Sequence, residues 1–168
     1  MTTPSASVSS CARAASAAES AYRIDAAIAP ARAARIMALD SGAAAVARSV
    51  ASQPWTSARF FVCEGVATPD PSTMGLILRG LDGAPASLDA ELDRADVVVM
   101  IATEDSGAEC AHALGRICWS RSIQTAGLVL GDGYEAADAV AALRPHARVL
   151  LPSADESDVV ELLTALRA

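Results

Sequence analysis

The segment DVVVMIA, residues 96–102, constrains the fold of this chain more than any other part of the sequence. Its apolar run from Val97 to Ala102 has no polar face, so a strand here must be buried on both sides, as strands of parallel sheets are. The run is far shorter than the roughly 20 apolar residues that span a membrane. It therefore predicts a central strand of a parallel sheet with helices on both faces.

Apolar segments of strand length alternate with segments of helical periodicity along the rest of the chain. We expect strands at residues 35–39, 59–63, 96–102, 125–130 and 148–151, and helices at 43–52, 88–95, 107–121, 134–146 and 155–168. The segment LILRGLDGAPAS, residues 76–87, starts apolar and then turns at its glycines and proline. Such alternation implies right-handed crossovers, and the predicted class is α/β: a three-layer Rossmann-like domain with a mainly parallel sheet and helices on both faces.

The chain has 168 residues, the size of one ordinary domain. Residues 1–30 are rich in alanine and serine and poor in acids, so we expect a flexible N-terminal segment that passes into a short helix before Pro30. Residues 31–168 then form the α/β domain. No apolar stretch is long enough for a membrane span.

Charge excludes some classes of function. The formal net charge is −7, and all 13 basic residues are arginines. Chemistry that needs lysine, such as a Schiff base or a P-loop, is therefore excluded. The arginines are scattered along the sequence, so the clustered cations that bind nucleic acid are not evident and no nucleic-acid partner is expected.

The cysteines do not form a disulfide or metal-binding pattern. They stand at positions 11, 63, 110 and 118 without CxxC spacing, which favours reduced thiols in the cytoplasm. Cys110 and His112 are two residues apart on one predicted helix and do not face the same way, so a metal site there would need distant ligands. A helix N-terminus could lower the pKa of the Cys110 thiol, but the neighbouring acids oppose this. No cofactor is expected, and no metal-ligand set is identified.

Six segments in order resemble the nucleotide-binding half of the tubulin/FtsZ family, the filament-forming GTPases. They are RIMALDSGAAAVARSV, ARFFVCEG, LRGLDGAP, LDRADVVVMIAT, QTAGLVLG and EAADAVAALRPHARVLLPSADES, which fall within about residues 33 to 160. The resemblance implies an FtsZ-like α/β domain over residues 31–168, with a nucleotide crevice at the carboxyl ends of the strands.

The departures from that family fall on its functional positions. Its glycine-rich first loop is DSGAA here, residues 40–44, and its GGGTGTG motif corresponds to residues 104–110, which keep only Gly107. Glycines let backbone N–H groups close on phosphate oxygens, whereas carboxylates repel phosphate by ~4 kcal/mol per pair at 4 Å and a dielectric constant of 20. The guanine-reading side chains become Ser153 and Ala154, and the loop that completes GTP hydrolysis has no counterpart. GTP hydrolysis is therefore not expected.

The crevice nonetheless remains the candidate ligand site, because parallel sheets present ligands at the carboxyl ends of their strands. Its candidate residues are Asp40, Ser41, Gly42, Glu64, Gly83, Glu104, Asp105, Ser106 and Gly107. The acids among them either form a pocket for Mg²⁺, a polyamine or a partner's arginine, or simply cap helices and face solvent.

The leading expectation is a non-catalytic FtsZ-like domain that acts by binding a protein partner or by self-association. The alternatives are a small-ligand or divalent-cation sensor or enzyme that uses the acidic crevice, and a divergent nucleotide-binding protein that uses Gly42 and Gly107 with other contacts.

Overall fold

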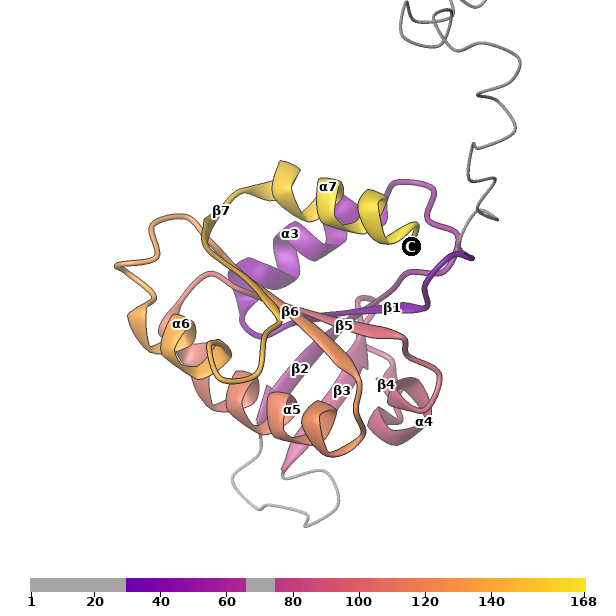
Figure 1. Cartoon of the computed structure of the whole chain (residues 1–168), viewed down its shortest axis with the longest axis horizontal. Coiled ribbons are helices and arrows are strands. Elements are labelled where there is room, and N and C mark those ends of the chain that lie inside the picture. The colour runs from indigo at the N-terminus through magenta and orange to yellow at the C-terminus, as the bar shows by residue number, and fades with distance from the viewer. Residues whose placement is uncertain (1–29, 66–74) are drawn as a thin grey trace, which may run out of the picture.

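The protein is an α/β domain built on one seven-stranded sheet (Figure 1). The computed structural model describes residues 30–65 and 75–168. The strands are β1 (Ala34–Ala38), β2 (Arg59–Gly65), β3 (Leu76–Gly80), β4 (Pro85–Ala86), β5 (Val97–Ala102), β6 (Gln124–Leu130) and β7 (Val149–Ala154). Their order is β4-β3-β2-β1-β5-β6-β7, and all neighbours are parallel except β3, which is antiparallel to β2 and β4.

Helices cover both faces of the sheet. They are α3 (Ser41–Ala51), α4 (Leu88–Leu92), the 3₁₀ turn η1 (Asp105–Gly107), α5 (Ala108–Ser120), α6 (Ala137–Leu143) and α7 (Glu156–Leu166). Figure 1 shows α3 and α7 on one face and α5 and α6 on the other. The predicted three-layer Rossmann-like class is therefore confirmed. Within the described residues, none of the helices combines the length and apolar character that crossing a membrane requires.

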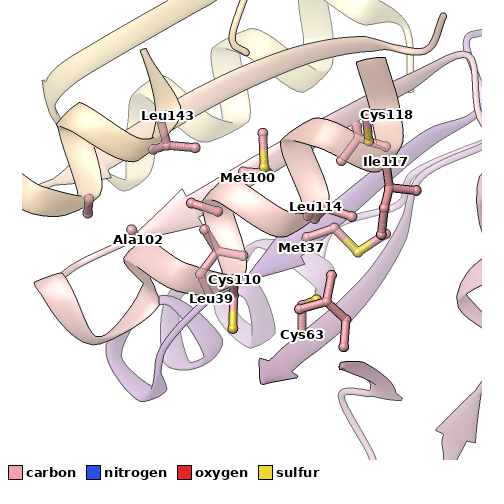
Figure 2. Close-up of a cluster of buried hydrophobic side chains, with 14 of the residues drawn as sticks. Met37, Leu39, Cys63, Met100, Ala102, Cys110, Leu114, Ile117, Cys118 and Leu143 are labelled. Atoms are coloured by element: carbon pink, nitrogen blue, oxygen red, sulfur yellow. The ribbon is translucent and has the colours of Figure 1, made fainter. Parts of the chain in front are cut away.

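The core consists of two clusters, one on each face of the sheet. Val99 and Ile101 of β5 pack toward α3 and α7, whereas Val98 and Met100 pack toward α5 and α6. Figure 2 shows the second cluster, with Met100 close to the side chains of α5. Every residue of β5 is buried, so the apolar run that led the prediction has the two-sided burial expected of it.

Two predicted regions differ from the structure. Residues 76–86, expected to lead into a turn, form the antiparallel strands β3 and β4, whose turn contains Gly83 at φ +84°. The helix expected at 134–146 is only the seven residues of α6, because residues 133–136 and 144–146 form turns. The predicted flexible segment, residues 1–30, lies outside the described residues except for its last residue.

A buried ion-pair network joins α4 to the amino ends of β1 and β2. Glu91 accepts hydrogen bonds from Arg35 Nε at 3.0 Å and from Arg59 Nη1 at 2.6 Å. The side chains of Arg35 and Glu91 are only 5% and 11% exposed. A second nitrogen of Arg35 donates to the carbonyl of Arg94, so the network also fixes the chain before β5.

We expect Glu91→Gln to lower the free energy of unfolding by about 3–5 kcal/mol, because it leaves the buried Arg35 guanidinium without its counter-charge. Urea unfolding measures this loss. Asp93→Asn is the matched control, since it removes an exposed carboxylate that pairs with Arg121 just beyond the same helix. A similar, small loss in both variants would contradict the role assigned to Glu91.

Candidate functional site

The crevice lies where the sheet changes winding direction. β1 and β5 are neighbours, but the chain leaves β1 for α3 on one face and β5 for α5 on the other. In open α/β sheets ligands bind at such a switch point, outside the carboxyl ends of the strands. Residues 40–42 and 104–107, which the sequence singled out, lie at this point, beside Leu39 and Thr103.

The Asp40 carboxylate fills the switch point. One oxygen, Oδ1, accepts from Ala43 N at 2.8 Å and so caps α3, and it also accepts from Thr103 Oγ1 at 2.6 Å. The other, Oδ2, accepts from Thr103 N at 2.7 Å and from Glu104 N at 3.3 Å. Asp40 is only 8% exposed. These are donors of the kind that hold a phosphate at a helix N-terminus, and here an internal anion occupies them.

The two glycines of the crevice bring its loops together. A Cβ at Gly42 would lie 2.2 Å from Thr103 Oγ1, and a Cβ at Gly107 would lie 2.8 Å from Leu39 Cβ and 3.1 Å from its carbonyl oxygen. Both positions therefore need glycine for contact between the β1 and β5 loops. The alternative of a divergent nucleotide-binding protein had assigned these two glycines to nucleotide contacts.

The acids predicted to repel phosphate have separate structural roles. Asp105 Oδ1 accepts from the backbone N–H groups of Asp138 and Ala139, at 2.8 and 3.0 Å, and so holds the start of α6. Glu104 is exposed and accepts from Ser106 Oγ at 3.1 Å. Asp40 and Asp105 thus act as helix caps, one of the two interpretations that the sequence left open.

A cavity of about 440 Å³ opens beside the switch point, at the carboxyl ends of β1 and β2 and along β3. We call it the β1–β3 cavity; the predicted residues that line it are Asp40, Ser41, Glu64, Gly83 and Ser106. Gly42, Glu104, Asp105 and Gly107 are not among its lining residues.

The β1–β3 cavity also contains two arginines that sequence reasoning missed, Arg48 of α3 and Arg79 of β3. Arg79 Nε lies 3.7 Å from Glu64 Oε2, and both side chains are about half exposed. Arg48 is exposed at its helix surface. The cavity therefore carries both signs of charge, unlike the acidic pocket that was one of the two interpretations of these acids. Arg79 gave no signal in the sequence because its segment was not predicted as a strand.

The buried cysteines do not have the character of reactive thiols. Burial raises the pKa of Cys118 to about 12 and also raises the pKa of Cys63 and Cys110. For Cys110, a hydrogen bond from the Gly65 backbone opposes the rise, but Glu109 and Glu64 add to it. The helix N-terminus does not activate this thiol. Within residues 30–65 and 75–168, no three His, Cys, Asp or Glu side chains are grouped to hold a metal ion.

No protein-family model matches the chain, and the comparison with curated protein sequences gives no match either. The resemblance to the tubulin/FtsZ family stays a prediction.

Replacing the internal anion should destabilise both loops of the crevice. We expect Asp40→Ala to lower the free energy of unfolding by about 3 kcal/mol, because it removes a helix cap and leaves the amides of Thr103 and Glu104 unsatisfied. Asp155→Ala is the control, since Asp155 caps α7 through Ser157 N and Asp158 N without bridging two loops. Chemical denaturation should show a clearly smaller loss for the control. Equal losses of unfolding free energy in the two variants would mean that the hydrogen bonds from the β5 loop to Asp40 contribute nothing to stability.

Proposed function

We propose that this chain is a non-catalytic α/β domain that acts by binding protein, and that the protein it binds is a second copy of itself. One observation carries the proposal: among the residues that the structure describes, the two most exposed aromatic side chains lie at opposite edges of the sheet, in surroundings of opposite charge. Trp119 is 77% exposed and Tyr134 is 93% exposed. Tryptophan, tyrosine and arginine are the residue types that most often dominate the energy of protein interfaces.

Trp119 lies at the edge where the strands begin. It stands near the end of α5, and it shares two surface hollows with Arg116, Arg148 and His146. Arg32 reaches the same edge through its hydrogen bond to the side chain of Gln124. In the described part of the chain, none of these three arginines forms an ion pair. We call Trp119 with Arg32, Arg116 and Arg148 the arginine edge.

Tyr134 lies at the opposite edge, where the strands end. It stands in the turn after β6, roughly 20 Å from the start of that strand. Asp132, Glu135 and Asp138 surround it in the sequence, and Asp132 Oδ1 accepts from Tyr134 N at 2.9 Å. Arg144 borders the same surface hollow as Tyr134. The three acids outnumber this arginine, so the surroundings of Tyr134 have an excess of negative charge. We call Tyr134 with these three acids the acidic edge.

Two opposite edges of one molecule that complement each other favour head-to-tail contacts between copies. Such contacts extend into chains when the rotation from one copy to the next does not close a ring. The resemblance to filament-forming GTPases implies the same mode of assembly. The Asp40 carboxylate at the switch point supports an assembly that neither needs nor hydrolyses nucleotide.

Sedimentation equilibrium at low salt tests the proposal. We expect concentration-dependent association of the wild type, weakened by added salt because exposed charges are screened. Trp119→Ser and Tyr134→Ser should each raise the dissociation constant roughly thirty-fold, equivalent to a loss of about 2 kcal/mol. Glu161→Gln, an exposed change in the middle of α7, is the control and should leave association unchanged.

Mixing the two variants distinguishes head-to-tail association from a symmetric contact. Each variant keeps one intact edge, so the mixture should form heterodimers that do not grow further. A monomeric wild type at all concentrations would contradict self-association, and a mixture no larger than either variant alone would contradict the head-to-tail arrangement.

A small anionic ligand in the β1–β3 cavity is the second candidate function. It is favoured by Arg48 and Arg79 on the wall of a cavity whose volume lies in the range of about 300–1,000 Å³ that is usual for ligand sites. Ser41 and Ser106 add hydroxyl donors. No nucleophile–base pair is apparent there, because the chain's two histidines are not among the lining residues.

A melting-temperature screen against nucleotides with Mg²⁺ and against small carboxylates and phosphates separates the two functions. A ligand at a hundredfold excess over its dissociation constant adds ~2.7 kcal/mol of stability. We expect no shift with GTP or GDP and no GTP turnover, because Asp40 occupies the phosphate donors. A shift with a small anion that Arg79→Gln abolishes would favour the second function.

A further inference from the structure

The chain's only two histidines, 34 positions apart in the sequence, meet on the surface. His112 lies on α5, and His146 follows α6. His146 Nε2 and His112 Nδ1 are 3.3 Å apart, and the ring centres are 5.2 Å apart with the planes tilted by 57°. His112 is exposed and His146 is partly so, and the pair therefore opens to solvent.

A glycine inside α5 makes this meeting possible. Gly115 is one helical turn after His112, and a Cβ there would lie 2.4 Å from both Cγ and Cδ2 of His146. Glycine in the interior of a helix costs about 1 kcal/mol relative to alanine. Gly115 therefore forms a notch for the His146 ring at the expense of helix stability.

The backbone of His146 is also held in place. Its N–H donates to the carbonyl of Leu143 at 3.0 Å, and its own carbonyl accepts from the hydroxyl of the buried Thr125 at the start of β6. The second imidazole therefore belongs to a fixed segment.

The spacing of the two nitrogens matches a chelate. Two imidazole nitrogens bound to one tetrahedral zinc ion at about 2.0–2.1 Å lie roughly 3.3–3.4 Å apart, with ring centres about 5 Å apart. The 3.3 Å separation also lies just beyond the range of about 2.7–3.2 Å that is usual for N–H···O hydrogen bonds in proteins. We propose that His112 and His146 form a two-nitrogen site for a divalent transition metal ion with a preference for imidazole, of the zinc, nickel or copper class, whose remaining positions are open to water.

The surroundings of the pair carry both signs of charge. Metal binding requires neutral imidazole. Arg116 and Arg148, which share surface hollows with His146, oppose a cation there, whereas Glu109 is one turn before His112 on the same helix. Its carboxylate is not grouped with the two rings.

Trp119 provides the reporter, because it borders the same two hollows as His146. The experiment uses the full chain carrying Cys11→Ser and Trp55→Phe, the second of which leaves Trp119 as the tryptophan that is observed. Ni²⁺ is titrated at a protein concentration where the chain is monomeric, and tryptophan fluorescence is followed. We expect saturable quenching with one ion per chain, reversal by Zn²⁺ and no effect of Mg²⁺. His112→Gln should weaken binding roughly a hundredfold, since a chelate becomes a single contact.

Two further variants separate the imidazole pair from its surroundings. Gly115→Ala should abolish quenching and lower the melting temperature, because its Cβ would lie 2.4 Å from Cγ and 2.7 Å from Cβ of His146, whose backbone is held in place. Glu109→Gln should retain quenching. The proposal is overturned by absence of saturable quenching, by equal quenching of the parent and His112→Gln, by unchanged binding in Gly115→Ala, or by loss of binding in Glu109→Gln alone.

Discussion

The structure at the carboxyl ends of β1 and β5 depends on one carboxylate. Asp40 closes the N-terminus of α3 and, through Thr103 and Glu104, ties the β1 loop to the β5 loop. These are the two loops between which an α/β sheet ordinarily receives a ligand. The close approach of the loops requires glycine at positions 42 and 107. These two glycines and Asp40 therefore form one arrangement.

The sequence could predict the fold class because burial on both faces removes every polar residue from β5, and this is visible in a single segment. It could not predict the hairpin of β3 and β4, where short strands meet at a turn and only the pairing with β2 defines them. It placed Asp40, Gly42, Glu104 and Gly107 at one crevice. Whether Asp40 faces a ligand or the neighbouring loop depends on the register of β1 against β5, for which the sequence has no local signal.

The direction of the helices brings several acids to the carboxyl ends of the strands. α5, α6 and α7 all begin at the same edge of the sheet and carry acids in their first turns, Glu109, Asp138, Glu156 and Asp158. Acids there and cations at the opposite ends both stabilise the helix dipole. Helix stabilisation accounts for these acids, whereas Arg32 and Arg148 of the arginine edge lie outside the helices. The exposed indole and phenol call for a further explanation.

A carboxylate that belongs to the chain also differs from a bound phosphate in a way that concerns regulation. A nucleotide can leave, be exchanged or lose its terminal phosphate, and loops that close on it then have an empty state and a filled one. Asp40 cannot dissociate. While Asp40 accepts these hydrogen bonds, the two crevice loops are held together by a group of the chain itself, and their closed arrangement needs no exchangeable ligand.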